Sequence, residues 1–112
     1  MTLTRFYLKQ HDRLPSLVAT LQYADGTPKD LTGCTVKFLM RRTRGALAKV
    51  DAAAVVTDAT TGAVRYDWAS GDTDTVGRWQ AEFEVKETAS GKLETFPNDQ
   101  SYLTMVISDD VA

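Results

Sequence analysis

Residues 77–86 read GRWQAEFEVK, and apolar and polar side chains alternate through this stretch without interruption. The polar residues fall on one face of an extended chain, and the other face carries Trp79, Ala81, Phe83 and Val85. A period of two is typical of a strand with one face in a core and one in water. The order Gly-x-aromatic-x-small is also found near the tyrosine corner of immunoglobulin-type sandwiches, with Trp79 in the place of the tyrosine. The stretch therefore predicts an all-β sandwich.

Seven further segments have strand-like patterns, and turn signals such as Asp25-Gly26 and Ser90-Gly91 separate them. We expect strands at residues 79–87, 6–9, 17–23, 36–41, 53–57, 63–68, 93–96 and 103–107. The alanine-rich residues 46–56 also have helical propensity, but the segment leads through a Thr-Thr-Gly turn into the alternating residues 63–68, which favours a hairpin. The fold class expected is an antiparallel, immunoglobulin-like β-sandwich of about seven to eight short strands.

Composition indicates a single globular domain over residues 1–112, because 43% of the residues are hydrophobic and 25% are charged. The formal net charge of −2 argues against nucleic acid as the main partner. One cysteine, Cys34, rules out a disulfide within the chain. The N-terminal residues do not have the pattern of a secretory signal, and no apolar run approaches the roughly 20 residues of a membrane span. We therefore expect synthesis in a cytoplasm and no membrane partner.

Two sets of residues have the side chains of a nucleophilic enzyme. His11, Asp12 and Ser16 are the residue types of a hydrolytic triad, but all three lie within six positions of one loop, where they cannot easily face one another. Cys34 begins a predicted strand and has no histidine close to it in sequence, so a mostly buried, unreactive thiol is favoured. Neither set predicts an enzyme.

Acidic residues gather around one predicted loop. Asp67, Asp72 and Asp74 could suggest a calcium-binding site there. A calcium loop usually adds a bidentate glutamate at a fixed spacing, and none is present here. Aspartate and threonine also close turns by binding their own backbone, which is the favoured interpretation. Glycine-rich phosphate loops and Cys/His metal spacings are absent from the sequence, so we expect no cofactor and no metal.

Arg41, Arg42 and Arg44 form the one basic cluster in the sequence. They could bind phosphate or an acidic protein partner, or they could be a solvated strand end, and both interpretations stay open. Leu39 lies on the polar face of the same predicted strand. If it adjoins Val106 or Val18, these residues would mark a second apolar surface, such as a subunit contact.

Two tryptophans end or begin predicted strands. Trp79 is in phase with apolar neighbours and is expected in the core. Trp68 lies at a strand end, so core packing and a sugar-stacking platform with Tyr66 are both considered for it.

The order of several motifs along the chain is itself informative. These motifs are FYLKQ-x-D-x-x-P (6–15), ATL (19–21), DGTP-x-DLTG (25–33), TG-x-V-x-Y-x-W (61–68), GDTDT-x-G (71–77) and GK-x-x-TFPN (91–98). As an ordered set they resemble the N-terminal domain of phage baseplate upper proteins, over nearly the whole chain. The sequence departs from the family at His11, where a glycine is usual, and at Cys34, where alanine is common.

The resemblance implies an immunoglobulin-like module of a tailed-phage virion that is not an enzyme. It would act as an adaptor or attachment module in the tail or baseplate, through contacts with other phage structural proteins and with copies of itself. Larger members of the family continue into a platform for receptor-binding proteins, so this sequence resembles the docking domain alone. Two alternatives stay open: a capsid decoration or neck protein of the same virion, and a carbohydrate-binding module for host surface glycan.

Sandwich edges and outer sheet faces are the surfaces through which such a module would assemble. The candidate contacts lie on the first strand, on the basic segment and on the last strand. The residues are Phe6, Tyr7, Leu39, Arg41, Arg42, Arg44 and Val106.

Overall fold

The computed structural model describes residues 5–99 and 101–111, and these residues form strands without any helix. The nine strands are β1 (Arg5–Lys9), β2 (Leu17–Thr20), β3 (Cys34–Arg41), β4 (Ala48–Ala53), β5 (Val55–Asp58), β6 (Ala63–Tyr66), β7 (Gly77–Glu87), β8 (Leu93–Phe96) and β9 (Leu103–Ser108). It follows that no helix in the described part of the chain could span a bilayer. Residues 1–4, on which the expectation about a secretory signal partly rests, lie outside the described residues.

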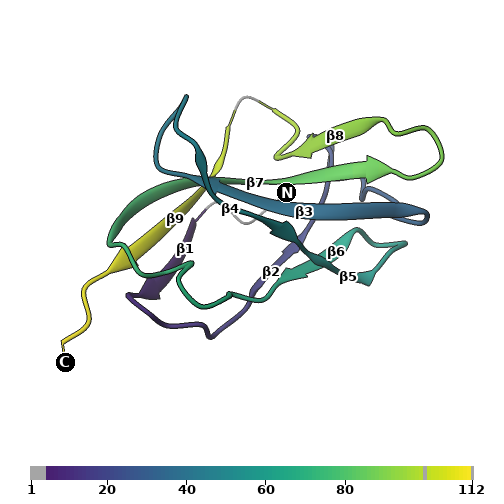
Figure 1. Ribbon diagram of the computed structural model, residues 1–112. Helices are drawn as coiled ribbons and strands as arrows, with labels where there is room; N and C mark the ends of the chain where they lie inside the picture. The colour runs from purple at the N-terminus through teal and green to yellow at the C-terminus, as the bar shows by residue number, and fades with distance from the viewer. Residues whose placement is uncertain (1–4, 100, 112) are drawn as a thin grey trace.

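The strands form two sheets that face each other, which confirms the predicted immunoglobulin-like sandwich (Figure 1). The larger sheet has the order β1-β9-β7-β3-β4, and the smaller sheet has the order β2-β6-β5. β7 is long enough to pair with two further strands, since its first half pairs with β9 and its second half with β8. The sequence that decided the fold therefore forms the central strand of the larger sheet.

One pairing departs from the expected antiparallel arrangement, because β1 pairs with β9 in parallel. After β1 the chain crosses to the other sheet, where β2 pairs with β6, so β1 and β2 do not form a hairpin. β1 instead lies beside a strand that is almost a whole chain length away. Alternation within a strand does not reveal its partner or its direction, so the sequence could not show this pairing.

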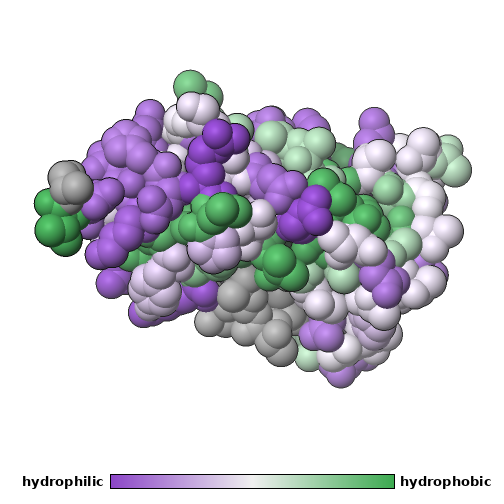
Figure 2. Space-filling model, turned by 90° about the horizontal axis from the view of Figure 1, so that it is seen from below, coloured by the Kyte–Doolittle hydropathy of each residue, from purple (hydrophilic) through white to green (hydrophobic). Residues whose placement is uncertain are grey.

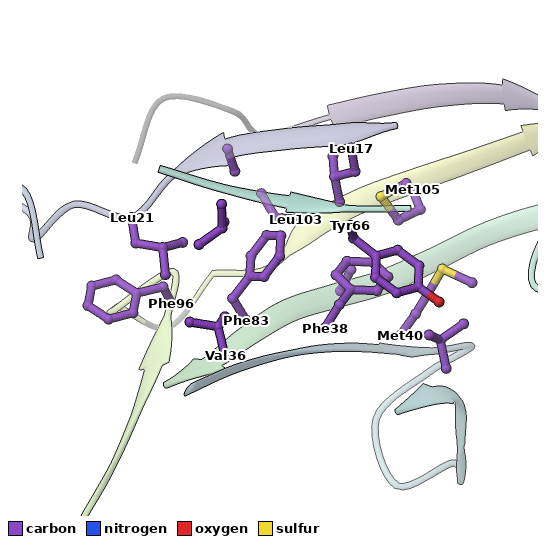
Figure 3. Close-up of a cluster of buried hydrophobic side chains, with 14 of the residues drawn as sticks. Leu17, Leu21, Val36, Phe38, Met40, Tyr66, Phe83, Phe96, Leu103 and Met105 are labelled. Atoms are coloured by element: carbon purple, nitrogen blue, oxygen red, sulfur yellow. The ribbon is translucent and has the colours of Figure 1, made fainter. Parts of the chain in front are cut away.

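The core lies between the inner faces of the two sheets, and its centre is aromatic (Figure 3). Phe38 of β3 is fully buried and contacts three rings: Tyr66 at 4.6 Å, Phe83 at 5.3 Å and Trp68 at 5.6 Å between ring centroids. Trp79 is 6% exposed, which confirms that it packs into the core. Its indole Nε1–H donates to the carbonyl of Thr75 four residues upstream, at 3.3 Å, in the way that a corner tyrosine binds upstream backbone.

β4 is the strand that sequence reasoning did not predict. It occupies the edge of the larger sheet, and Val50 is its only buried residue. Its register with β3 shifts between Met40 and Arg41, so the apolar alternation is broken as well as weak. Only Ala54 then separates β4 in one sheet from β5 in the other. The predicted hairpin of β5 and β6 is confirmed, although β5 begins at Val55.

Several turns have backbone with positive φ, and two of them are informative. Gly62, in the β5–β6 turn, has φ +74°, and a Cβ on it would lie 2.6 Å from the carbonyl oxygen of Leu21 and 2.8 Å from that of Lys29. His11, after β1, has φ +71°, a conformation that glycine adopts more readily than any residue with a side chain. This conformation explains why glycine suits the position that His11 occupies here.

Candidate protein-interaction face

The outer face of the larger sheet carries two cross-strand rows of basic and aromatic side chains. In one row Tyr7 of β1 lies beside Val106 of β9, which lies beside Arg78 of β7. The next row runs from Arg5 of β1 through Thr104 and Gln80 to Arg41 of β3. Because residues two apart in a strand share a face, these rows lie on the same surface. We call this surface the basic face, and its residues are Arg5, Tyr7, Lys9, Arg41, Arg78, Tyr102 and Val106.

Arg41 is the best-anchored cation of the basic face. Its Nε donates to Oε1 of Gln80 at 3.2 Å, and its Nη2 donates to the hydroxyl of Tyr102 at 3.4 Å. The guanidinium carbon also lies 5.5 Å from the centroid of the Tyr102 ring, within cation–π range. The side chain is half-buried, so these contacts fix its guanidinium in one orientation before any partner binds.

A groove of about 160 Å³ adjoins this arginine. Its walls include Leu39, Arg41, Glu82 and Tyr102, and they combine apolar and charged groups. A broader, shallower depression continues from it past Arg44 toward β8. The basic face is therefore bordered by a hollow surface rather than by a flat sheet.

The charges on the basic face have no acidic partners within the described residues. The four ion pairs among those residues lie elsewhere and join Lys29 to Glu94, Lys37 to Asp51, Lys49 to Asp74 and Arg65 to Asp67. Arg5, Lys9 and Arg78 are exposed to solvent. Acidic side chains appear further along β7, at Glu82 and Glu84, which pair in register with Leu39 and Lys37 of β3. One end of the outer face is thus cationic and the other is mixed.

The structure places the three predicted arginines in three different environments. Arg41 belongs to the basic face, whereas the Arg42 guanidinium lies 5.1 Å from the ring of Trp79 and donates to the carbonyl of Val76 at 3.1 Å. Arg44 is exposed in the loop between β3 and β4. Arg41, Arg42 and Arg44 therefore do not form the single basic patch that their sequence positions suggested. Neighbouring residues at a strand end point in different directions, and Trp79 binds one of the arginines.

Two other candidates are not part of the basic face, although Leu39 borders it in the groove beside Arg41. The Phe6 ring is half-buried, packs against the core and lies 6.2 Å from Trp68. Leu39 pairs with Glu82 of β7, four residues along that strand from the partner of Val106, so the two do not adjoin. The suggested apolar surface of Leu39 with Val106 or Val18 is therefore absent, since Val18 belongs to the smaller sheet.

The opposite face, formed by the smaller sheet, is less charged. Val18, Arg65 and Val55 make one cross-strand row, and both valines are exposed. Arg65 pairs with Asp67 at 2.9 Å, so its charge is already balanced. In Figure 2, which views the molecule from this side, apolar areas are interrupted by polar ones.

The residues considered for catalysis do not converge. Ser16 donates to Oδ1 of Asp67 at 2.7 Å, and Asp12 contributes its backbone carbonyl to Thr73. The amide N–H of His11 donates to the carbonyl of Thr73. Cys34 is half-buried rather than mostly buried, because its strand begins at the sheet's end. The hydrolytic arrangement is therefore not assembled.

The acidic loop has the turn chemistry expected of it. One carboxylate oxygen of Asp72 accepts from the hydroxyl of Tyr66 at 2.5 Å and from the amide of Ala69 at 2.8 Å. Asp74 accepts from Lys49 at 2.7 Å and from Thr75 at 2.8 Å, and these hydrogen bonds lower its pKa. Within the described residues, no three acidic, histidine or cysteine side chains gather as a metal site would require.

The proposed sugar platform is not formed, because Trp68 is 2% exposed and Tyr66 is 3% exposed. Burial, and then the hydrogen bond to Asp72, raise the pKa of the Tyr66 hydroxyl. A sugar ring cannot stack on side chains that lie inside the sandwich. These residues belong to the core even though the strand β6 ends at Tyr66.

Arg5, Lys9, Arg78 and Tyr102 are the members of the basic face that sequence reasoning missed. Arg78 lies on the polar side of the stretch whose alternation was recognised, and Lys9 ends the predicted first strand. Arg5 and Tyr102 each come directly before a predicted strand. What was missing was the strand order, which brings β1 beside β9 and β9 beside β7. Without that order, the cations appear scattered along the sequence.

Comparisons with known proteins agree with the fold. The sequence profile of the family described as the BppU N-terminal domain matches residues 4–100. Among solved structures, the N-terminal domain of phage TP901-1 ORF48 is similar, with a TM-score of 0.59 and 18% sequence identity. The match covers 95% of this chain and 84% of that one, and at this identity it indicates a shared fold. Among curated proteins, none matches the chain in sequence.

Proposed function

Because the chain belongs to the BppU N-terminal domain family, a family of phage structural domains, we propose that it is an adaptor module of a tailed-phage virion. It acts in the tail or baseplate by binding neighbouring structural proteins, and it catalyses no reaction. Residues 1–112 make up one immunoglobulin-like domain that serves this purpose. The observation that carries the proposal is the family match over residues 4–100.

The arrangement of the side chains supports this proposal. Arginine and tyrosine are the residue types that contribute most to protein–protein interfaces, and both occur together on the basic face. Tyr7 is 61% exposed although it is large and aromatic, which is expected of a contact residue. We assign partner binding to this face and propose that several copies of the chain are present in each particle.

The test is to purify virions produced from the genome that encodes the chain and to locate it by cryo-electron microscopy. Density at the tail tip or baseplate would support the adaptor. Density over the capsid or at the neck would make the chain a decoration or connector protein and would refute the tail assignment. Absence of the chain from particles, measured by mass spectrometry, would refute a structural role in the virion altogether.

A further inference from the structure

We propose that the basic face binds an acidic protein surface, whose carboxylates fit between the cations of β1, β7 and β3. This inference rests on the proposed function, because it names the chemistry of the partner that the adaptor binds. The occupant is a neighbouring virion protein with clustered aspartate or glutamate side chains. Three features of the face support it: its charge, its side-chain types and its limited extent.

The charge of the face is unusual for this chain. The whole sequence has a net charge of −2, yet Arg5, Arg41 and Arg78 lie together in two rows that hold no carboxylate, and Lys9 lies beside Ser108 in the next row. Of the nine lysines and arginines elsewhere, four form ion pairs within the described residues, whereas none of the four on the basic face does. Unbalanced like charges repel one another, and an acidic partner removes that repulsion.

The side-chain types favour a folded protein as the partner. Val106 lies between Tyr7 and Arg78 across neighbouring strands, and Arg5 is two residues from Tyr7 on β1, so apolar contact area is mixed with charge. Arg41 is held in place by Gln80 and Tyr102, so little side-chain freedom is lost when it binds a carboxylate. Guanidinium groups can also bind carboxylates through two parallel hydrogen bonds, which gives the contact a defined geometry.

The extent of the face argues against a polyanion such as nucleic acid. Three strand spacings separate β1 from β3, so the cations span about 14 Å across the sheet. Glu82 and Glu84 follow on β7 directly beyond the cationic rows. A phosphate chain running along the sheet would meet these carboxylates within one or two nucleotides. A compact acidic patch on a protein would not.

The decisive variant is Arg5→Glu with Arg78→Glu, because no hydrogen bond or ion pair within the described residues depends on either side chain. The matched control is Lys86→Glu with Lys92→Glu, which makes the same change of charge on exposed residues at the other end of β7. We expect the first variant to be incorporated into virions about tenfold less than wild type, the effect of losing about 1.4 kcal/mol of binding. The control should remain within twofold of wild type.

A lost contact must be distinguished from a disturbed fold. Thermal unfolding of the purified variants must match wild type, and Arg5→Ala with Arg78→Ala gives a milder variant if the reversal disturbs folding. If wild type enters virions and the Arg5→Glu/Arg78→Glu variant enters equally well, the inference is wrong while the proposed function stands. If wild type is itself absent from virions, the proposed function is refuted, and the inference that rests on it is refuted as well.

Photo-crosslinking identifies the occupant directly. The photoreactive residue p-benzoyl-phenylalanine replaces Tyr7 on the basic face, and in a control chain it replaces Val55 of the smaller sheet. We expect the Tyr7 position to cross-link to an aspartate- or glutamate-rich segment of another virion protein, with a higher yield than the control position. A cross-link to nucleic acid, to a second copy of this chain, or to a segment without acidic residues would overturn the inference.

Discussion

Replacing Gly62 with alanine should reveal how closely the β5–β6 turn packs against the segment after β2. The new Cβ would lie 2.6 Å from the carbonyl oxygen of Leu21 and 2.8 Å from that of Lys29, and both of these are backbone atoms. The same region holds two backbone hydrogen bonds, from the Leu21 amide to the Gly62 carbonyl at 2.8 Å and from the Lys29 amide to the Leu21 carbonyl at 2.9 Å. A shift large enough to admit the methyl group strains both bonds.

The chain offers a matched control for the backbone part of this effect. Gly33 has the same φ of +74°, but a Cβ on it would have no atom within 4 Å. Gly33→Ala should therefore cost only the conformational strain of the left-handed region, about 1 kcal/mol. Gly62→Ala adds overpacking against backbone, about 1–3 kcal/mol, for a total of about 2–4 kcal/mol.

Urea unfolding followed by circular dichroism gives the free energy of unfolding of both variants. The two values are compared provided that the free energy of unfolding depends equally steeply on urea concentration in both. A Gly62→Ala loss at least 1 kcal/mol larger than the Gly33→Ala loss would support the reasoning; that margin is about the lower end of the overpacking range. Equal losses would refute it, because the close approach to Leu21 and Lys29 would then not lower the free energy of unfolding.

Phe38→Ala should lower the free energy of unfolding by about 3–5 kcal/mol in urea titrations, since a fully buried ring with three aromatic neighbours is removed; a loss below about 2 kcal/mol would mean that the core collapses around the cavity. His11→Gly should raise the melting temperature by relieving a positive φ, with a gain of about 1 kcal/mol, and no gain would show that the turn is unstrained. The pKa of Asp74 is lowered by hydrogen bonds from Lys49 and Thr75, so the stability that it contributes is present above its ordinary value of 3.8 and is lost as the pH falls through its folded value. Asp74→Asn should therefore flatten the fall in stability below about pH 4 in acid titrations, and an unchanged slope would contradict this assignment.

Alternation along single strands made most of the sandwich predictable from the sequence. The period of two in residues 77–86 identified the central strand β7, and similar patterns located seven of its eight companions. β4 escaped detection because an edge strand with one buried valine and a register shift lacks that period. Its position depends on pairing with β3, which is a property of the tertiary fold.

The candidate site was only partly predictable, for a related reason. Tyr7, Arg41 and Val106 were identified as contact residues, and the structure places them on one face. Arg42 was grouped with Arg41 because the two are neighbours in sequence, whereas the structure places Arg42 over Trp79. Nearness in sequence therefore grouped arginines that the fold separates. Strand order shows which side chains share a face.

The parallel pairing of β1 with β9 has a mechanical consequence. Arg5 lies beside Thr104 and Lys9 beside Ser108. The first residue of β1 and the last residue of β9 therefore lie at opposite ends of this ladder. Tension applied at Arg5 and Ser108 pulls the two strands past each other along their common axis. The hydrogen bonds of the ladder then bear the load together instead of opening one after another, as they would in a hairpin pulled from its open end. A module built in this way resists being stretched between Arg5 and Ser108.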